Sequence, residues 1–478
     1  MNANLTGRHR SLWLREAVTG QPQPPLSGHH GTDVAIIGGG FVGLWTALRI
    51  KHLDPSVRVT ILEADICGGG ASGRNGGLVL SWWPKIWSLM RLFGEQEAVR
   101  LVQSTEQAIT ELESFCDNHA PEAEFRRAGW LWTATSPAHL DSWERVAQVS
   151  DRLGTGTFTP MTPGQVATRS GSPVHLGGVL DRSAASVHPG HLVRAMRRAA
   201  LAMGVEIFEG TRVRHLARRG APTVRTQGGG SVRAQRVVIA TNAWAAGMRE
   251  LHTRLFVISS DMIVTEPVPD RLEEIGWREG PTVTDSQTLL CYYRTTNSGR
   301  IAFGKGGWTI GLGGRISPSM DRNPRRARAV IRDFRRYYPM LRDVPIVNDW
   351  AGPIDRTHNS LPLINWLNPG HTIAYGVGWS GNGVGPSIIG GKVLASMVLG
   401  RGDEWGRSVL INAPTRHFPP DPIRFVGAHV VREALIRKER SEALGIEPSW
   451  VSKTLSKLAP AGLEDKNEAP PPGAQHRS

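Results

Sequence analysis

The chain has few cysteines and no long apolar run. Cys67, Cys116 and Cys291 are its only cysteines among 478 residues, and none forms a CxxC pair. We therefore expect neither a disulfide scaffold nor a metal site, and a reducing compartment suits the composition. No stretch approaches the roughly 20 apolar residues that a membrane-spanning helix needs. Residues 1–31 lack the apolar core of a signal peptide. The sequence predicts a cytoplasmic protein without a membrane span.

Acidic residues are outnumbered, with 56 Lys and Arg against 42 Asp and Glu and a formal net charge of +14. Such an excess of positive charge can bind nucleic acid, an anionic membrane or an acidic substrate, or it can belong to a solvated surface. Residues 321–342 hold eight Arg against two Asp on a segment with an apolar stripe, and Arg194, Arg197 and Arg198 lie on a second such segment. Both patterns predict a helix with a solvated basic outer face, so we expect no nucleic-acid partner.

Strand-helix units occur at both ends of the chain, and short β-rich runs recur between residues 255 and 308. This pattern predicts an α/β plus α+β fold, in which a Rossmann-type dinucleotide-binding domain is interleaved with an antiparallel-sheet substrate domain. The nucleotide-binding domain would comprise 31–85, 187–245 and 350–400, and the substrate domain 86–186 and 246–349. An N-terminal arm (1–30), a C-terminal helical extension (401–459) and a disordered tail (460–478) complete the division.

A glycine-rich loop follows the first predicted strand. Gly38, Gly40 and Gly43 form a GxGxxG pattern between that strand and a helix, and Glu63 ends the next strand. The glycines allow a tight turn and close approach of a pyrophosphate to the helix N-terminus, which includes Phe41 and Val42. The Glu63 carboxylate can accept hydrogen bonds from ribose hydroxyls and disfavours a 2′-phosphate. The loop therefore predicts dinucleotide binding and leaves FAD and NAD open.

Four further segments bear on that choice: residues 71–77 (ASGRNGG), 187–190 (VHPG), 238–244 (VIATNAW) and 378–384 (GWSGNGV). In order and spacing they resemble the D-amino-acid oxidase superfamily of FAD-dependent amine oxidases, over residues 13–457. The likeness is greatest to the bacterial branch that includes γ-glutamylputrescine oxidase and to the glycine and sarcosine oxidases. The resemblance implies FAD as the cofactor. It also implies cofactor contacts from Ser72, Arg74, Asn75, Gly76, Val213, Thr241, Asn242, Gly381, Asn382, Gly383 and Val384.

The chain departs from the family at three places. Asn382 stands where many relatives carry His, which removes a group that can become charged. The segment 71–77 holds no His and no cysteine follows Cys291, so we predict that FAD is held non-covalently. Arg356 lies two residues beyond the position of the family's substrate-clamping Arg. It can reach an anionic group of the substrate or pair with Asp355, and we favour the pair with Asp355.

Flavin-dependent amine oxidation needs orientation and a neutral amine more than a dedicated base. A partly apolar pocket favours the neutral amine, and aromatic candidates for it are Trp82, Trp83, Trp308, Trp379, Tyr292 and Tyr293. Of these, Trp379 adjoins the predicted flavin-edge loop. Lys305 is a candidate cation for the reaction with oxygen, because relatives place a Lys over the flavin. His358 is a second polar candidate.

Together these features predict FAD-dependent oxidation of a small primary or secondary amine, such as an amino acid or polyamine derivative. The amine would become an imine by hydride transfer to flavin N5, and O2 would reoxidise the flavin and yield H2O2. The alternatives are a dehydrogenase of the same fold with another electron acceptor, a maturation or tRNA-modification flavoenzyme, and a cofactor-binding partner protein.

Overall fold

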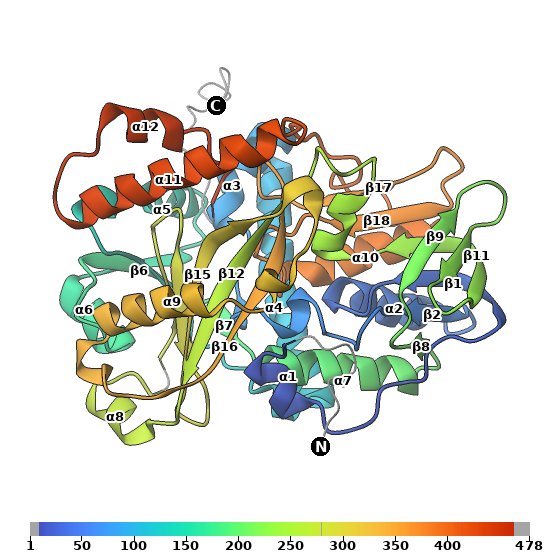
Figure 1. Ribbon diagram of the computed structural model, residues 1–478, viewed down its shortest axis with the longest axis horizontal. Coiled ribbons are helices and arrows are strands. Elements are labelled where there is room, and N and C mark those ends of the chain that lie inside the picture. Colours follow the sequence, from blue (N-terminus) through green and yellow to red (C-terminus); the bar gives the residue numbers. More distant parts are fainter. Residues whose placement is uncertain (1–8, 279, 463–478) are drawn as a thin grey trace.

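The computed structural model describes residues 9–278 and 280–462, without the side chain of Trp308. Two large sheets lie side by side with helices around them (Figure 1). The α-helices are α1 (Leu12–Ala17), α2 (Phe41–Leu53), α3 (Ile86–Phe93), α4 (Glu95–His119), α5 (Glu144–Arg152), α6 (Pro163–Ser170), α7 (Pro189–Ala202), α8 (Pro269–Glu274), α9 (Pro324–Tyr337), α10 (Pro386–Val398), α11 (Ile423–Ala443) and α12 (Trp450–Ser456).

The first sheet has the order β17-β18-β11-β1-β2-β8, with β9 and β10 attached at β11. Neighbouring strands from β18 to β8 are parallel, and α2 and α10 pack against each other beside them. Its strands are β1 (His29–Ile37), β2 (Val59–Leu62), β8 (Glu206–Phe208), β9 (Val213–Ala217), β10 (Thr223–Thr226), β11 (Ser231–Ile239), β17 (Leu363–Trp366) and β18 (Ile373–Val377).

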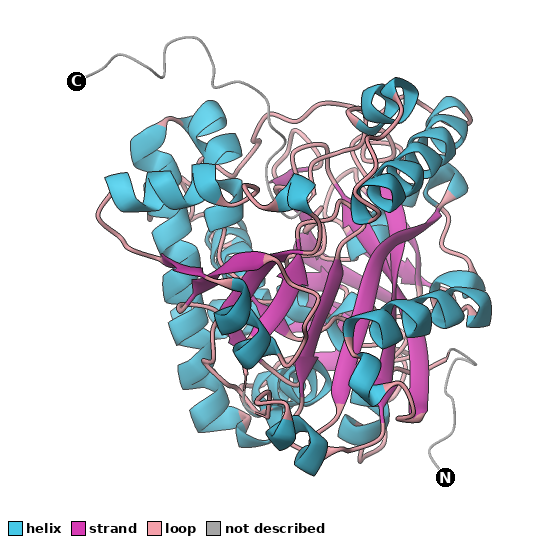
Figure 2. Ribbon diagram, turned by 90° about the vertical axis from the view of Figure 1, so that its left-hand side faces the viewer, coloured by secondary structure: helices cyan, strands magenta, loops and turns pink. Residues whose placement is uncertain are grey.

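The second sheet has the order β16-β12-β15-β14-β13-β4-β6-β5 and is antiparallel except between β13 and β4. Helix α9 packs against β12 and β15, and α11 also contacts β15. Figure 2 shows the strands enclosed between groups of helices. The strands are β4 (Trp130–Ala134), β5 (Phe158–Met161), β6 (Gly177–Asp181), β12 (Phe256–Thr265), β13 (Thr282–Asp285), β14 (Cys291–Thr295), β15 (Ile301–Ile310) and β16 (Ile346–Arg356). The small strands β3 (Leu78–Val79) and β7 (Ala185–Ser186) pair separately.

The predicted interleaving of a parallel and a largely antiparallel sheet agrees with this architecture. One domain boundary differs in detail. The predicted boundary at 350 falls inside β16, which continues to Arg356 as part of the second sheet. Between residues 86 and 119 the chain forms two helices, because Gly94, with a φ of +81°, separates α3 from α4. Residues 9–30 and 460–462 are also tied to the body of the molecule, as the buried Leu12 and Trp13 of α1 show for the first of these. The rest of the predicted tail lies outside the described residues.

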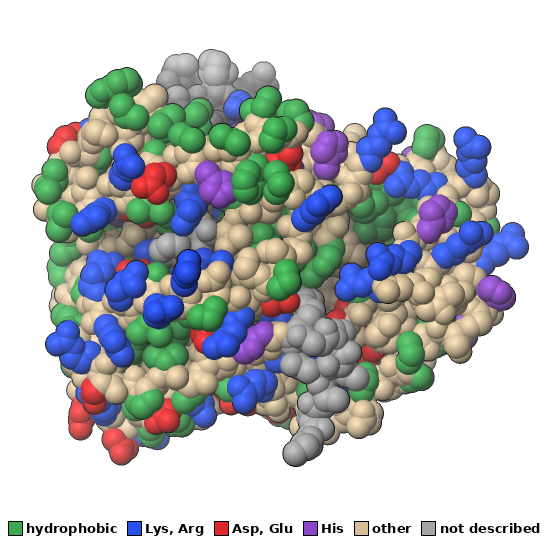
Figure 3. Space-filling model, viewed as in Figure 1, with side chains coloured by type: hydrophobic (Ala, Val, Ile, Leu, Met, Phe, Trp, Pro, Cys, Tyr) green, Lys and Arg blue, Asp and Glu red, His purple; other side chains and the backbone are tan. Residues whose placement is uncertain are grey.

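The basic helices follow the predicted pattern only in part. Helix α9 buries Ala327, Val330 and Phe334, and Lys and Arg side chains gather over its region on the face shown in Figure 3. On α7, however, Arg194 and Arg197 are 6% and 7% exposed and both pair with Glu209. The prediction of an outward basic face is therefore wrong for these two arginines, because the buried carboxylate of Glu209, directly after β8, compensates them.

Candidate active site

The glycine-rich loop adopts a conformation that side chains would prevent. Gly38 has a φ of +114°, and a Cβ there would lie 2.4 Å from the Ala240 carbonyl oxygen. A Cβ on Gly43 would lie 2.0 Å from the Gly38 carbonyl oxygen. The loop thus folds tightly against the start of α2, and Ser72 Oγ accepts a hydrogen bond of 2.9 Å from the Phe41 N–H. The first turn of α2 is positioned to hold an anion.

Glu63 lies beside this loop, at the end of β2. Its carboxylate accepts hydrogen bonds from the Gly39 N–H at 2.8 Å and the Asp65 N–H at 2.9 Å. Burial raises the pKa of Glu63 to about 7, against the effect of these two hydrogen bonds, and the negative charge of Asp65 adds to the rise. Each carboxylate oxygen retains a lone pair that can accept from a ribose hydroxyl.

The segment of residues 71–77 crosses from the loop toward the second sheet. Arg74 is 2% exposed, and its guanidinium donates to the carbonyl oxygens of Gly69 at 3.1 Å and Ala351 at 2.9 Å. Asn75 donates to the Ser72 carbonyl at 2.8 Å and accepts from the Gly77 N–H at 2.8 Å. Arg74 therefore joins the glycine-rich segment after Glu63 to β16 of the second sheet, while Asn75 fixes the turn around which the segment bends.

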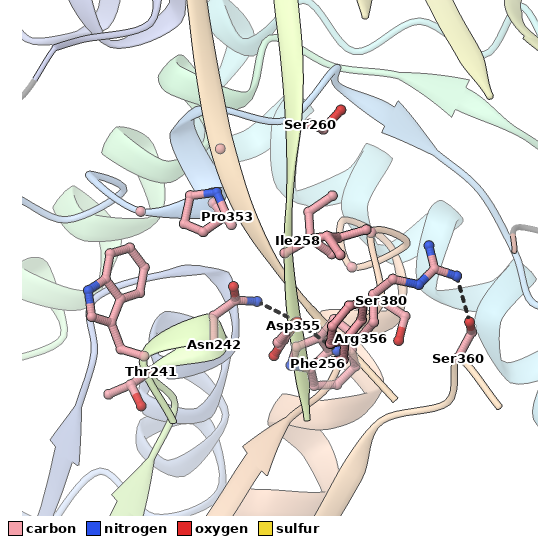
Figure 4. Close-up of a pocket in the computed structure, with 18 of the residues that line it drawn as sticks. Thr241, Asn242, Phe256, Ile258, Ser260, Pro353, Asp355, Arg356, Ser360 and Ser380 are labelled. Carbon is pink, nitrogen blue, oxygen red and sulfur yellow. Dashed lines mark hydrogen bonds between the residues drawn. The ribbon is translucent and has the colours of Figure 1, made fainter. Parts of the chain in front are cut away.

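Asp355, on β16, connects this strand with two other parts of the site. Its carboxylate accepts from the Gly378 N–H at 2.5 Å, the Trp379 N–H at 3.1 Å and the Asn242 side-chain amide at 3.0 Å. Figure 4 shows the contact between Asn242 and Asp355. Asp355 is fully buried, and burial raises its pKa to about 7. From the sequence, Asp355 is expected only as a partner of Arg356. No local signal marks its role, because β16 also carries Asp349 and Arg356.

The loop between β18 and α10 is shaped by this carboxylate. Gly378, Ser380 and Gly381 have φ values of +82°, +56° and +89°. Asn382 donates its side-chain amide to the Ser81 carbonyl at 3.1 Å. Trp379 is 5% exposed, packs against Gly390 of α10 and has no hydrogen-bond partner for its Nε1 among the described residues. The loop therefore meets the predicted cofactor region with backbone groups held in place from both sheets.

A cavity of about 1690 Å³ connects these parts. Its walls include Tyr292, Arg356 and His358, and the residues of the C-terminal helix α11 close its far side. Tyr292 O–H contacts Ser260 Oγ at 2.7 Å, and the His358 ring lies 6.2 Å from that of Phe418. Arg356 extends from β16 toward Ser360, as Figure 4 shows.

The predicted cofactor contacts converge on this cavity. Those that line it are Gly38, Gly40, Phe41, Val42, Glu63, Ser72, Arg74, Asn75, Gly76, Val213, Thr241, Asn242, Gly381, Asn382, Gly383 and Val384. Gly43 packs behind the loop instead. A glycine-lined approach, a helix N-terminus and a carboxylate with free acceptor sites fit the pyrophosphate and ribose of a dinucleotide. Within the described residues no cluster of side chains is suited to hold a metal ion, and no helix has the length and apolarity to cross a membrane.

Lys305 does not reach this cavity. On β15 it is paired with Cys291 of β14, and its side chain forms an ion pair of 3.1 Å with Asp333 of α9. Tyr292 and Gly304, one residue away on each strand, face the cavity side. Because successive side chains of a strand alternate between faces, Lys305 points to the opposite face. The prediction that Lys305 lies over the flavin therefore differs from the structure by one residue in the register of β15.

Two other predictions need correction. Trp82 is 2% exposed and belongs to the core of the first sheet rather than to the cavity wall; Trp83 lies in the same core and Tyr293 in that of the second sheet. Arg356 does not pair with Asp355, because neighbouring residues on β16 point to opposite sides and backbone N–H groups already occupy the Asp355 carboxylate. The Trp308 side chain lies outside the described part of the structure.

Comparison with known proteins identifies the family. The model of the FAD-dependent oxidoreductase (DAO) family matches residues 33–397. A probable oxidoreductase OrdL from Rhizobium meliloti (strain 1021) is 30% identical over 402 residues, covering 82% of this chain and 89% of that protein. The gamma-glutamylputrescine oxidoreductase of Escherichia coli (strain K12) is 27% identical over 390 residues, covering 81% and 88%.

A solved structure of similar fold is the glycine oxidase from Geobacillus kaustophilus. It superposes with a TM-score of 0.67 at 21% identity, covering 82% of this chain and all of that one. The fold, the glycine-rich loop and the family match agree. The chain therefore belongs to the DAO family, as an FAD-dependent oxidoreductase of the class that acts on CH–NH or CH–NH2 groups.

Proposed function

We propose that the protein oxidises a small primary or secondary amine to an imine and passes the electrons to O2, releasing H2O2. The observation that carries this proposal is a continuous cavity that leads from the phosphate loop to a region lined by Phe256, Ile258, Ile354 and Tyr292. FAD bound along the loop would supply the hydride acceptor. The apolar walls favour the neutral form of the amine, which is the form that can be oxidised.

The candidate substrates come from the relatives. A match to a gamma-glutamylputrescine oxidoreductase favours a polyamine derivative, and the 24% identity with a glycine oxidase from Bacillus licheniformis, over 44% of this chain, supports a small amino acid more weakly. In the proposed site, Tyr292 and Ile258 bound the space for the amine, and Arg356 lies at the side away from the phosphate loop. His358 remains a candidate polar contact.

We also propose that FAD is held non-covalently. Acid precipitation of the yellow protein would test this, because non-covalent flavin is released into the supernatant.

The test is a peroxide-coupled screen of the FAD-loaded protein against amines, amino acids and polyamine derivatives. The expected result is peroxide formation with one chemical class and none with a matched compound that lacks the amine. Anaerobic reduction by the active compound, followed by air, then measures reoxidation. A protein that retains no FAD, or that no compound of these classes reduces, would contradict the proposal.

A dehydrogenase with another electron acceptor is the second candidate. The observation that favours it is the position of Lys305, since the cation expected to assist oxygen faces α9 instead of the cavity. Reduction by an amine with slow reoxidation in air, and fast reoxidation by an artificial quinone, would select the dehydrogenase.

A further inference from the structure

Arg356 is a cation inside the cavity, and among the described residues no carboxylate pairs with it. Its guanidinium donates to Ser360 Oγ at 3.0 Å and to the Ala461 carbonyl oxygen, and its Nε has no hydrogen-bond partner among the described residues. Burial lowers its pKa to about 10, and within residues 9–278 and 280–462 no carboxylate offsets that effect. A buried cation that has only neutral partners is costly, so this position favours an anion.

The place of that anion is taken by the chain itself. Residues 459–462, here called the strap, follow α12 and run back into the cavity, whose wall includes Ala459, Pro460 and Gly462. The Ala461 carbonyl oxygen accepts from both Arg356 and Ser360 Oγ, the latter at 2.7 Å. The Gly462 carbonyl oxygen accepts from Lys85 Nζ at 2.6 Å.

Two further contacts with described residues hold the strap, in which Ala459 and Ala461 are both buried. Its Ala461 N–H donates to the His358 carbonyl oxygen at 3.2 Å, and Ala459 packs in a small cluster with Leu289 and Leu435. Both Leu289 and Leu435 line the cavity. The strap contributes neutral carbonyl oxygens where a carboxylate would make charge-assisted hydrogen bonds, which are roughly twice as strong. The two occupants cannot use the same donors at once.

We propose that the strap is an internal competitor, which occupies the anion-binding donors of Arg356 and Ser360 and is displaced by a carboxylate carried on the substrate. This inference rests on the proposed amine oxidation and narrows its substrate to an amine with a carboxylate group. The strap protects the buried cation when no substrate is bound, and its displacement couples substrate binding to opening of the C-terminal side of the cavity.

The experiment measures binding of an anion that cannot be oxidised. Valerate and its neutral analogue valeramide are titrated calorimetrically into three FAD-loaded proteins: the full chain, a chain that ends after Leu458, and a chain that ends after Pro470. Loss of the strap should lower the Kd for valerate about tenfold and leave the Kd for valeramide within about twofold. The chain that ends after Pro470 keeps the strap without placing a new C-terminal carboxylate on it, and it should bind as the full chain does.

A point variant tests the same contact without truncation. Ala461→Pro removes the N–H that holds the strap to His358 and should lower the Kd for valerate several-fold, whereas Ser456→Ala, outside the strap, should not. Adding Arg356→Gln to the chain that ends after Leu458 should abolish the gain in affinity for valerate that this truncation produces. Equal Kd values for valerate with and without the strap, or an equal gain for valeramide, would overturn the inference.

The two proposals fail separately. FAD content and amine oxidation are measured on the full chain, whereas valerate binding requires no turnover. If the protein oxidises amines but shows no strap effect, only the strap proposal is contradicted. If it shows the strap effect but no amine oxidation, the proposed reaction and the assignment of the carboxylate to an amine substrate are contradicted, and the competition at Arg356 stands.

Discussion

The two ends of the cavity hold buried groups of opposite charge, and these groups have different kinds of partners. At the nucleotide end the carboxylate of Glu63 lies between two backbone N–H groups and still has acceptor sites facing the cavity. At the other end the guanidinium of Arg356 has neutral oxygens as its partners and a lowered pKa. The nucleotide end is preorganised by one strand-loop-helix unit. The far end is assembled from distant segments, and the part of the chain that the structure describes supplies no counter-ion there. The difference indicates where the protein is rigid and where its ligand must complete the structure.

The largest effect is expected at the rigid end, from Gly43→Ala. A Cβ at this position would lie 2.0 Å from the Gly38 carbonyl oxygen, so the loop must shift away from α2. We expect FAD content to fall to about a tenth or less, since a displaced loop cannot hold a pyrophosphate. The measurement is the flavin-to-protein absorbance ratio after purification. Gly31→Ala, where nothing lies within 4 Å, is the matched control and should retain FAD; a flavin-loaded Gly43→Ala protein would contradict the rigid-loop interpretation.

Asp355→Asn should have the next largest effect, because Asp355 connects the two ends. An amide nitrogen in place of a carboxylate oxygen opposes the N–H groups of Gly378 and Trp379. We expect a loss of about 2–5 kcal/mol in the free energy of unfolding, measured by urea denaturation. Asp349→Asn on the same strand is the control: its carboxylate pairs with the partly exposed Arg322, so its loss should cost about 1 kcal/mol or less. If the two variants lose similar amounts of unfolding free energy, the hydrogen bonds of Asp355 do not hold the two ends of the site together.

Glu63→Gln should have a moderate effect that depends on pH. The raised pKa means that the folded apoprotein keeps a proton on Glu63 between the ordinary pKa of 4.5 and about 7, while the unfolded chain releases it. This group's contribution to stability is therefore present below pH 4.5 and is lost as the pH rises through about 7.

The measurement for Glu63→Gln is the Tm of the apoprotein at pH 5 and pH 8. The variant should show a smaller drop in Tm across this range than the parent chain. At pH 8 its Kd for FAD should rise about tenfold, because hydrogen bonds from the ribose to a charged acceptor are lost. Parallel pH profiles for variant and parent would argue against a neutral Glu63 in the apoprotein.

The smallest effect is expected from Lys305→Met. Its side chain lies on the α9 face of the second sheet, beside Asp333, so the rate at which the reduced protein reacts with air should change less than about threefold, whereas removal of a cation that stabilises superoxide costs far more. Stopped-flow reoxidation measures this rate. The expected cost is instead a lower Tm from the broken ion pair. A large fall in the reoxidation rate would instead support the prediction from sequence that Lys305 assists the reaction of the reduced flavin with oxygen.

The nucleotide end could be predicted from the sequence because its information is local. The loop from Gly38 to Gly43, Glu63 after the next strand, and the helix from Pro386 all lie within short strand-loop-helix units whose periodicity shows in the residues. The far end could not be predicted in the same way. Lys305 and Tyr292 lie on paired strands, and the register of that pairing decides which face of the sheet each side chain occupies. An error of one residue in the register places a side chain on the opposite face. The contact between Arg356 and Ala461 joins positions that no local pattern relates.

The pairing of β4 with β13 has a consequence for how the chain is made. Trp130 and Thr284, 154 positions apart, meet across these strands through the Trp130 indole N–H. During synthesis, the early strands β4, β5 and β6 have one open edge until the later hairpins have left the ribosome. Non-local pairing of this kind is slow and leaves strand edges exposed to aggregation. We expect nascent chains shorter than about 310 residues to depend on chaperones, and the yield of folded protein to fall with temperature before the stability of the finished enzyme does.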